Sequence, residues 1–336
     1  MRTVLKALVV LVVLALFAAY TGYRFWQVKL EAPIAVDEQI IYEVPQGAGF
    51  NRVIAELESR GILSDSWAFK LLARIEPQRV HSLKPGEYML QPEMSGLDVL
   101  DKLNSGDVVT YKVTIPEGWS FKQMRAVLDD AEKLSHDTAD MSDEDLMAEL
   151  GYEDEHPEGR FFPDTYTYHK GVSDEQILSQ SLRRMDRLLD DAWAKRDEGL
   201  PYETPYEALI MASLIEKETG APQERREIAG VFVRRLERGM RLQTDPTVIY
   251  GMGDRYDGNI TRADLRKKTP YNTYVIEGLP PTPIALPGKA SLEAAMHPAE
   301  GETLYFVAKG DGTGTHHFSR TLREHNEAVR RYILKR

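Results

Sequence analysis

Two glutamates, Glu216 and Glu218, end an apolar segment in the middle of the chain, directly before a threonine and a glycine. Further along, the string Gln-Thr-Asp-Pro-Thr at 243–247 places amide, hydroxyl and carboxylate groups within a few residues of one another. A carboxyl group at the end of a helix and close to such a loop suits proton transfer to a sugar oxygen.

Glu218 shares a predicted helical face with apolar residues, since Ile215, Leu214 and Met211 stand three, four and seven positions before it. This face predicts a carboxyl against the core or a cleft wall. Desolvation and the negative end of the helix dipole then raise its pKa. A carboxyl that stays protonated near neutral pH can serve as a general acid. The pattern alone leaves open an ordinary exposed glutamate in a last helical turn.

Glu216 lies two positions earlier and therefore points to another side of the same helix. We predict a structural role for it, in an ion pair with Arg225 or Arg226.

Polar and aromatic side chains gather around 243–250 and again around 270–274, the second group preceding a stiff proline-rich loop at 278–284. Sugars are bound by such mixtures of amide, carboxylate and aromatic groups. Each cluster by itself also fits ordinary turn chemistry. The candidate substrate-binding residues are Gln243, Asp245, Thr247, Tyr271 and Asn272; all of them except Thr247 could instead orient Glu218.

The first 30 residues differ from the rest of the chain. Arg2 and Lys6 precede a stretch without charge from Ala7 to Tyr23, and Arg24 follows it. A helix needs about 17–25 apolar residues to cross a bilayer, so this segment predicts one uncleaved signal anchor with a cytoplasmic N-terminus. A cleaved secretory signal is the alternative.

Composition excludes several kinds of chemistry. The chain has no cysteine, so it offers no disulfide, thiol nucleophile or thiolate metal site. Its histidines, such as His317, lack metal-ligand spacing, and neither G-x-S-x-G nor S-x-x-K occurs. We therefore expect no metal and no cofactor.

The net charge of −11 is concentrated in one segment, 129–158, which holds thirteen Asp or Glu and a single Lys, so the rest of the chain is nearly neutral. Such a run is typical of a solvated face, and it lacks the calcium-loop pattern. No basic stripe could follow a phosphate backbone, so nucleic acid is not an expected partner.

Strands and helices mix without regular βαβ alternation, which predicts an α+β fold. The strand–turn–helix pattern at 44–57 recurs 71 residues later at 115–128. Helices are expected at 174–196, 204–219, 225–238 and 322–334, and a hairpin at 303–318. The first strand–turn–helix unit resembles the start of a LysM glycan-binding module.

Five segments together resemble the YceG-like family of endolytic murein transglycosylases, namely 212–219, 231–236, 241–250, 271–274 and 278–281. Residue 282 departs from that pattern, with Thr282 where glycine is usual. The resemblance implies a transmembrane helix at 1–30, a small LysM-like subdomain at 31–108 and a mixed α+β catalytic domain at 109–336. It also implies that Glu218 is the catalytic acid.

The resemblance further implies a lyase of the inner membrane with its catalytic domain in the periplasm. Glu218 would protonate the oxygen between N-acetylmuramic acid and N-acetylglucosamine in nascent peptidoglycan strands, and the 6-hydroxyl would close a 1,6-anhydro end. Strand synthesis could be terminated in this way, with cell-wall synthases as partners. Two alternatives stay open: a hydrolase that pairs Glu218 with Asp245, and a non-catalytic glycan-binding scaffold.

Overall fold

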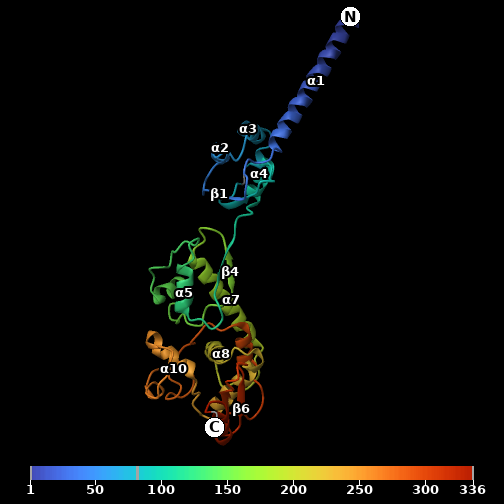
Figure 1. The fold of residues 1–336 in the computed structure, drawn as a ribbon. Coiled ribbons are helices and arrows are strands. Elements are labelled where there is room, and N and C mark those ends of the chain that lie inside the picture. Colours follow the sequence, from blue (N-terminus) through green and yellow to red (C-terminus); the bar gives the residue numbers. More distant parts are fainter. Residues whose placement is uncertain (1, 81–82, 335–336) are drawn as a thin grey trace. The chain divides into compact units, whose positions relative to one another are not determined.

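The computed structural model of this chain describes residues 2–80 and 83–334 (Figure 1). The chain divides into two compact units, Met1–Tyr111 with Thr167–Gly171 and Lys112–Tyr166 with Val172–Arg336. Helices and small two-stranded sheets alternate irregularly along the chain. The expected mixed α+β architecture is therefore confirmed.

The long apolar helix α1 (Arg2–Leu30) opens the first unit as one continuous helix (Figure 1). It is long and apolar enough to cross a membrane, and a signal sequence would have the same character. Its last turns belong to a folded core, because Trp26 and Leu30 are buried. The indole N–H of Trp26 donates to the backbone oxygen of Ala68 at 3.0 Å.

The rest of the first unit packs around one antiparallel strand pair. Tyr42 lies opposite Tyr88 in this pair, and both side chains are fully buried. The elements are β1 (Ile40–Val44), α2 (Phe50–Ser59), α3 (Ser66–Ile75), η1 (Pro77–Arg79), β2 (Gly86–Leu90) and α4 (Gly96–Ser105). The assignment of this unit as LysM-like stays a prediction.

The strand–turn–helix repeat has the same turn geometry at both places. Gly47 and Gly118 occupy equivalent positions and have φ angles of 74° and 76°, a region that favours glycine because it has no Cβ. The second copy runs from β3 (Tyr111–Thr114) to α5 (Phe121–Asp129). Its strand pairs with β4 (Thr165–Tyr168), so the two copies contribute to different sheets.

The second unit is built mainly from helices, with one hairpin near the C-terminal end. The hairpin pairs β5 (Tyr305–Ala308) with β6 (His316–Ser319), as the sequence predicts. The helices are α6 (Asp143–Glu149), α7 (Asp174–Ala194), α8 (Pro205–Glu218), α9 (Arg225–Glu237), α10 (Asp245–Met252), α11 (Lys289–Met296) and α12 (Leu322–Tyr332), with short turns η2 (Pro222–Glu224), η3 (Gly253–Arg255) and η4 (Asp264–Arg266).

Helix α8 is the centre of this unit. Thr204 caps its start by accepting a hydrogen bond from the backbone of Glu207, and Pro205 occupies the first turn. Every residue from Ala208 to Ile215 is buried, and α7, α9, α10 and α11 pack around the helix. A helix that is apolar on all sides is held by its neighbours on all sides, so its C-terminal end has a defined position.

The acidic segment is mostly exposed, as expected, but its last residue is an exception. Glu158 is buried, and its carboxylate accepts hydrogen bonds from the backbone N–H of Phe121 at 3.0 Å and the hydroxyl of Tyr250 at 3.1 Å. Burial raises the pKa of Glu158 to about 7. The expectation of a solvated face was therefore wrong for Glu158, which ties the start of α5 to α10.

Candidate active site

The two glutamates at the end of α8 face different surroundings. Glu216 is held on all sides: its carboxylate accepts from the backbone N–H of Gly288 at 3.0 Å and the hydroxyl of Ser291 at 2.7 Å. Arg225 lies 3.5 Å away and completes the predicted ion pair. Glu218 is instead directed into a cleft of about 380 Å³. Only Glu218 is free to meet a ligand.

The loop before α10 forms one side of this cleft. Thr244 donates a hydrogen bond from its hydroxyl to the carboxylate of Glu218. Asp245 starts α10 and accepts from the hydroxyl of Tyr274 at 2.6 Å. Gln243 has a φ angle of 53°, an uncommon value for a residue with a Cβ that costs on the order of 1 kcal/mol. Strain at this point marks a loop held in position by its surroundings.

The surroundings of Glu218 raise the pKa of its carboxyl group. Its pKa is raised to about 7; burial is the main cause, and the nearby charge of Asp245 acts in the same direction. The hydroxyl of Thr244 and the charges of His316 and Arg235 act in the opposite direction. Desolvation is thus the cause that dominates, as expected from the apolar character of α8. Glu218 is half protonated near neutral pH.

Arg235 lines the cleft and connects the segments that form it. Its guanidinium donates to the backbone oxygens of Leu304, Arg241 and Leu242 at 2.7, 3.0 and 2.9 Å. One buried cation thereby joins α9 to the chain before β5 and to the loop that carries Gln243.

The opposite wall of the cleft is aromatic. Tyr305 and His325 stack with their ring centroids 5.3 Å apart, and both line the cleft. Burial lowers the pKa of His325, so its imidazole is neutral at pH 7. Its Nδ1 has no hydrogen-bond partner among residues 2–80 and 83–334. This nitrogen is itself buried, so the flat rings, and not this atom, are suited to contact a sugar.

Comparison with known proteins decides the family. Residues 42–331 of the chain match the YceG-like family. The chain belongs to the YceG-like family. Its relatives include a protein of Bacillus subtilis strain 168 named endolytic murein transglycosylase, which is 31% identical over 91% of this chain and 88% of that protein.

Two further similarities extend over nearly the whole chain. An endolytic murein transglycosylase of Streptococcus pneumoniae strain D39 is 29% identical over 98% of this chain, which spans only 65% of that longer protein. A crystal structure of a YceG-like protein from Listeria monocytogenes is 34% identical, with a TM-score of 0.56 over 87% of this chain and 99% of that one. The fold described above is therefore that of the YceG-like family.

The predicted site residues of this YceG-like chain fall into two groups. Gln243 and Asp245 line the cleft together with Glu218. Thr247 is fully buried, and its hydroxyl donates to the backbone oxygen of Thr244 at 2.7 Å. Because it has no exposed surface, Thr247 lies under the loop instead of in the cleft. Its predicted contact with substrate does not fit this position.

Asn272 and Tyr271 also lie outside the cleft lining. Asn272 is buried, and its amide donates to the backbone oxygens of Asp264 and Lys267 at 3.0 and 2.7 Å. The hydroxyl of Tyr271 lies 2.9 Å from that of Thr282, and its ring packs on the core. The structure therefore gives Asn272 and Tyr271 partners within the protein, and such residues hold the loops of the YceG-like site in place.

Several residues of the site were not among the predicted ones. Thr244 directly precedes Asp245 in the sequence, and Tyr274 stands two positions after Asn272 in the second polar cluster, so membership of these clusters was a usable signal. His316 carried no such signal, because its partner Glu224 is 92 residues away; Nδ1 of His316 lies 2.8 Å from the Glu224 carboxylate. Only the folded chain brings this pair close to Glu218.

One group of side chains in the described part of the chain could hold a metal ion, although none is expected from the sequence. Asp129, His136 and Asp174 have ligand atoms within 4.8 Å of one another. Asp174 already accepts hydrogen bonds from the backbone and hydroxyl of Thr138. These residues line no part of the Glu218 cleft.

Substitutions of Thr244 and Asp245, the two neighbours of Glu218, should change the pKa of Glu218 in opposite directions. Thr244→Val removes a donor that stabilises the charged carboxylate, so the pKa of Glu218 should rise by about one unit. Asp245→Asn removes a like charge, so the same pKa should fall. Carbon-13 NMR titration of the Glu218 carboxyl measures both. Shifts of equal sign in the two variants would contradict this assignment of causes.

Proposed function

We propose that this protein is an endolytic lytic transglycosylase that cuts peptidoglycan strands between N-acetylmuramic acid and N-acetylglucosamine. The observation that carries the proposal is Glu218, a single carboxyl with a pKa of about 7 in a cleft walled by polar and aromatic side chains. The names of the relatives from Bacillus subtilis and Streptococcus pneumoniae support the same reaction class.

The proposed reaction uses Glu218 first as acid and then as base. The protonated carboxyl gives its proton to the glycosidic oxygen, and the bond from that oxygen to C1 of the muramic acid breaks. The 6-hydroxyl oxygen of the same sugar bonds to C1, and its proton passes to the Glu218 carboxylate. The carboxyl is regenerated, no water is consumed, and the products are a 1,6-anhydro end and a free 4-hydroxyl.

The remaining cleft residues receive supporting roles in this proposal. Gln243 and Asp245 bind the hydroxyl and amide groups of the glycan, and the stack of Tyr305 and His325 carries a sugar ring. The buried residues Thr244, Thr247 and Asn272, together with the half-buried Tyr271, position the loop that faces Glu218.

The charge around α1 supports a proposal for the location of the protein. Arg2 and Lys6 precede the charge-free stretch, and short basic N-termini stay in the cytoplasm. We propose that α1 is an uncleaved anchor in the inner membrane, that both folded units face the periplasm, that the first unit binds glycan, and that cell-wall synthases are partners.

A hydrolase remains the second candidate, because Asp245 lies in the cleft with Glu218 and a second carboxylate can activate water. Product mass separates the two. The full-length chain in detergent, incubated with uncrosslinked glycan strands, should release ends about 18 Da lighter than hydrolysed ends. Products with water added would overturn the lyase, and intact strands would favour the non-catalytic scaffold.

The pH dependence of this reaction has a predicted direction. Because Glu218 must start protonated, the rate should fall as the pH rises through about 7. Initial rates of strand cleavage by the full-length chain between pH 5 and pH 9 measure this. A rate that rises over the whole range would contradict the acid role of Glu218.

A further inference from the structure

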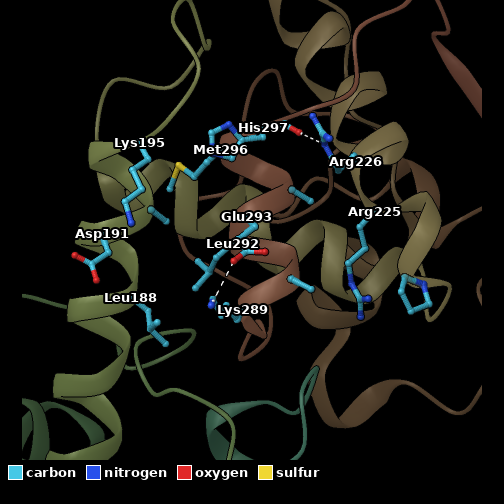
Figure 2. Close-up of a pocket in the computed structure, with 14 residues that line it drawn as sticks. Leu188, Asp191, Lys195, Arg225, Arg226, Lys289, Leu292, Glu293, Met296 and His297 are labelled. Atoms are coloured by element: carbon cyan, nitrogen blue, oxygen red, sulfur yellow. Dashed lines mark hydrogen bonds and ion pairs between the residues drawn. The ribbon is translucent and has the colours of Figure 1, made fainter.

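A second cavity, larger than the Glu218 cleft, lies in the same unit and has a volume of about 660 Å³ (Figure 2). Its walls come from α7, α9 and α11. The two linings have no residue in common. A volume of this size falls in the range of about 300–1,000 Å³ that is typical of small-molecule sites. Nothing in the reaction proposed for Glu218 uses this cavity.

The cavity is basic although the protein as a whole is acidic. Four cationic side chains line it against two carboxylates, whereas the net charge of the chain is −11. The cations are Lys195, Arg225, Arg226 and Lys289; the carboxylates are Asp191 and Glu293. A surplus of positive charge in a concave site attracts anionic ligands.

Two of these cations, Lys195 and Arg226, still have N–H donors that a ligand can use. Lys195 forms no ion pair with any residue in the described ranges 2–80 and 83–334, and its side chain is exposed. Arg226 uses its Nε to donate to the backbone oxygen of His297 at 2.7 Å, which fixes the guanidinium at the rim (Figure 2). A fixed guanidinium binds a carboxylate through parallel hydrogen bonds.

The other two cations are already engaged. Lys289 lies 3.6 Å from Glu293, and the two are drawn as an ion pair in Figure 2. Arg225 donates to Ser291 at 3.1 Å and pairs with Glu216. Because Arg225 also supports the end of α8, it is unsuitable for a test of ligand binding.

The floor of the cavity is apolar. Leu188 and Ala192 come from α7, and Leu292, Ala294 and Met296 from α11. Such a surface suits short aliphatic side chains, and the basic rim suits carboxylates. The ligand chemistry that fits is a short peptide with several carboxylates and small side chains.

We propose that this cavity binds the stem peptide of a peptidoglycan strand, with its carboxylates at Lys195 and Arg226 and its alanyl side chains on the floor. Stem peptides combine alanine with dicarboxylic residues joined through a γ-linkage, which matches both parts of the cavity. This inference rests on the proposed function for the class of substrate, although the binding itself requires no cleavage. It adds to the Glu218 cleft a site that recognises the peptide part of the same polymer.

The test measures binding of a free stem peptide to the full-length chain in detergent by isothermal titration calorimetry. The probe is the tripeptide L-alanyl-γ-D-glutamyl-meso-diaminopimelate, which carries no sugar. We expect micromolar to millimolar binding, weakened at least about tenfold in Lys195→Glu/Arg226→Glu. Arg238→Glu is the matched control, since Arg238 is an exposed cation at the other end of α9 and does not line the cavity. It should bind as the unchanged chain does.

Three results would overturn the proposal: no binding of the tripeptide at millimolar concentration, equal binding by the double variant, or tighter binding of an α-linked acidic peptide of the same charge. The last result would assign the cavity to a protein partner. Cleavage of the glycan is scored separately by product mass. If the peptide binds but the released ends are hydrolysed, the lyase reaction is refuted and the cavity assignment stands. If the ends are anhydro ends but the peptide does not bind, the cavity assignment is refuted and the lyase reaction stands.

Discussion

Glu218→Gln should reduce the rate of glycan cleavage about 10³-fold or more, because glutamine fills the same space and cannot give up a proton. Asp245, the other carboxyl of the cleft, accepts a hydrogen bond from the hydroxyl of Tyr274, and we expect it not to replace Glu218 as the proton donor. Release of strand ends by the full-length variant measures the loss. Cleavage at an unchanged rate would refute Glu218 as the catalytic acid.

The same variant should become more stable at alkaline pH. Burial raises the pKa of Glu218 from 4.5 to about 7, so the folded chain binds more protons than the unfolded chain between these values. The free energy of unfolding contributed by this group falls as the pH rises through that window. Each pKa unit corresponds to about 1.4 kcal/mol. Glu218→Gln should therefore gain up to about 3 kcal/mol at pH 8 and almost nothing at pH 4.

Glu216→Gln is the matched control, two positions away on the same helix. Arg225 and Ser291 hold this carboxylate in place, so loss of its charge should lower the stability by about 1–3 kcal/mol. Melting temperatures at pH 4 and pH 8, measured by scanning calorimetry, distinguish the two variants. Equal effects of both substitutions would contradict the different roles given to the two glutamates.

Arg235→Met should be the most destabilising substitution near the site. It leaves the backbone oxygens of Leu304, Arg241 and Leu242 without their buried donor. Unsatisfied buried carbonyls and a lost charge-assisted bond together cost about 3 kcal/mol or more. The melting temperature should fall by about 6–12 °C. Cleavage should be lost as well, because Gln243 and the Tyr305 wall lose their common support.

Two further variants test whether the loss of stability comes from the several hydrogen bonds that the Arg235 guanidinium donates. Arg235→Lys keeps the charge but cannot reach three carbonyls at once, so it should restore only part of the stability. Arg238→Met removes an exposed arginine just past the end of the same helix, and it should change the melting temperature by less than about 1–2 °C. A large loss in Arg238→Met would show that the effect is general to α9.

Local patterns in the sequence predicted most of the elements near the site. The apolar run predicted a helix at 204–219, which is α8, and the hairpin expected at 303–318 is formed by β5 and β6. The apolar face of the helix indicated the direction of the pKa shift of Glu218, but the burial that raises this pKa comes from the helices packed around α8.

The positions of Glu216 and Glu218 on different faces of the helix explain only part of the difference between them. Because α8 is buried on every side, Glu216 is as enclosed as Glu218, and its side chain is only 6% exposed. The two differ in their partners instead. Gly288, Ser291 and Arg225 satisfy Glu216, whereas Thr244 leaves Glu218 open to the cleft.

By itself, the sequence determined the chemical type of the site: one acid at the end of α8, a polar loop and an apolar segment that can enter a membrane. These are properties of residues close together in the chain. Only the tertiary structure decided which polar residues reach the cleft, because the hydroxyl of Thr247 and the amide of Asn272 are turned to partners inside the protein, and because His316 meets Glu224 across 92 residues of chain. The basic cavity likewise exists only where α7, α9 and α11 meet.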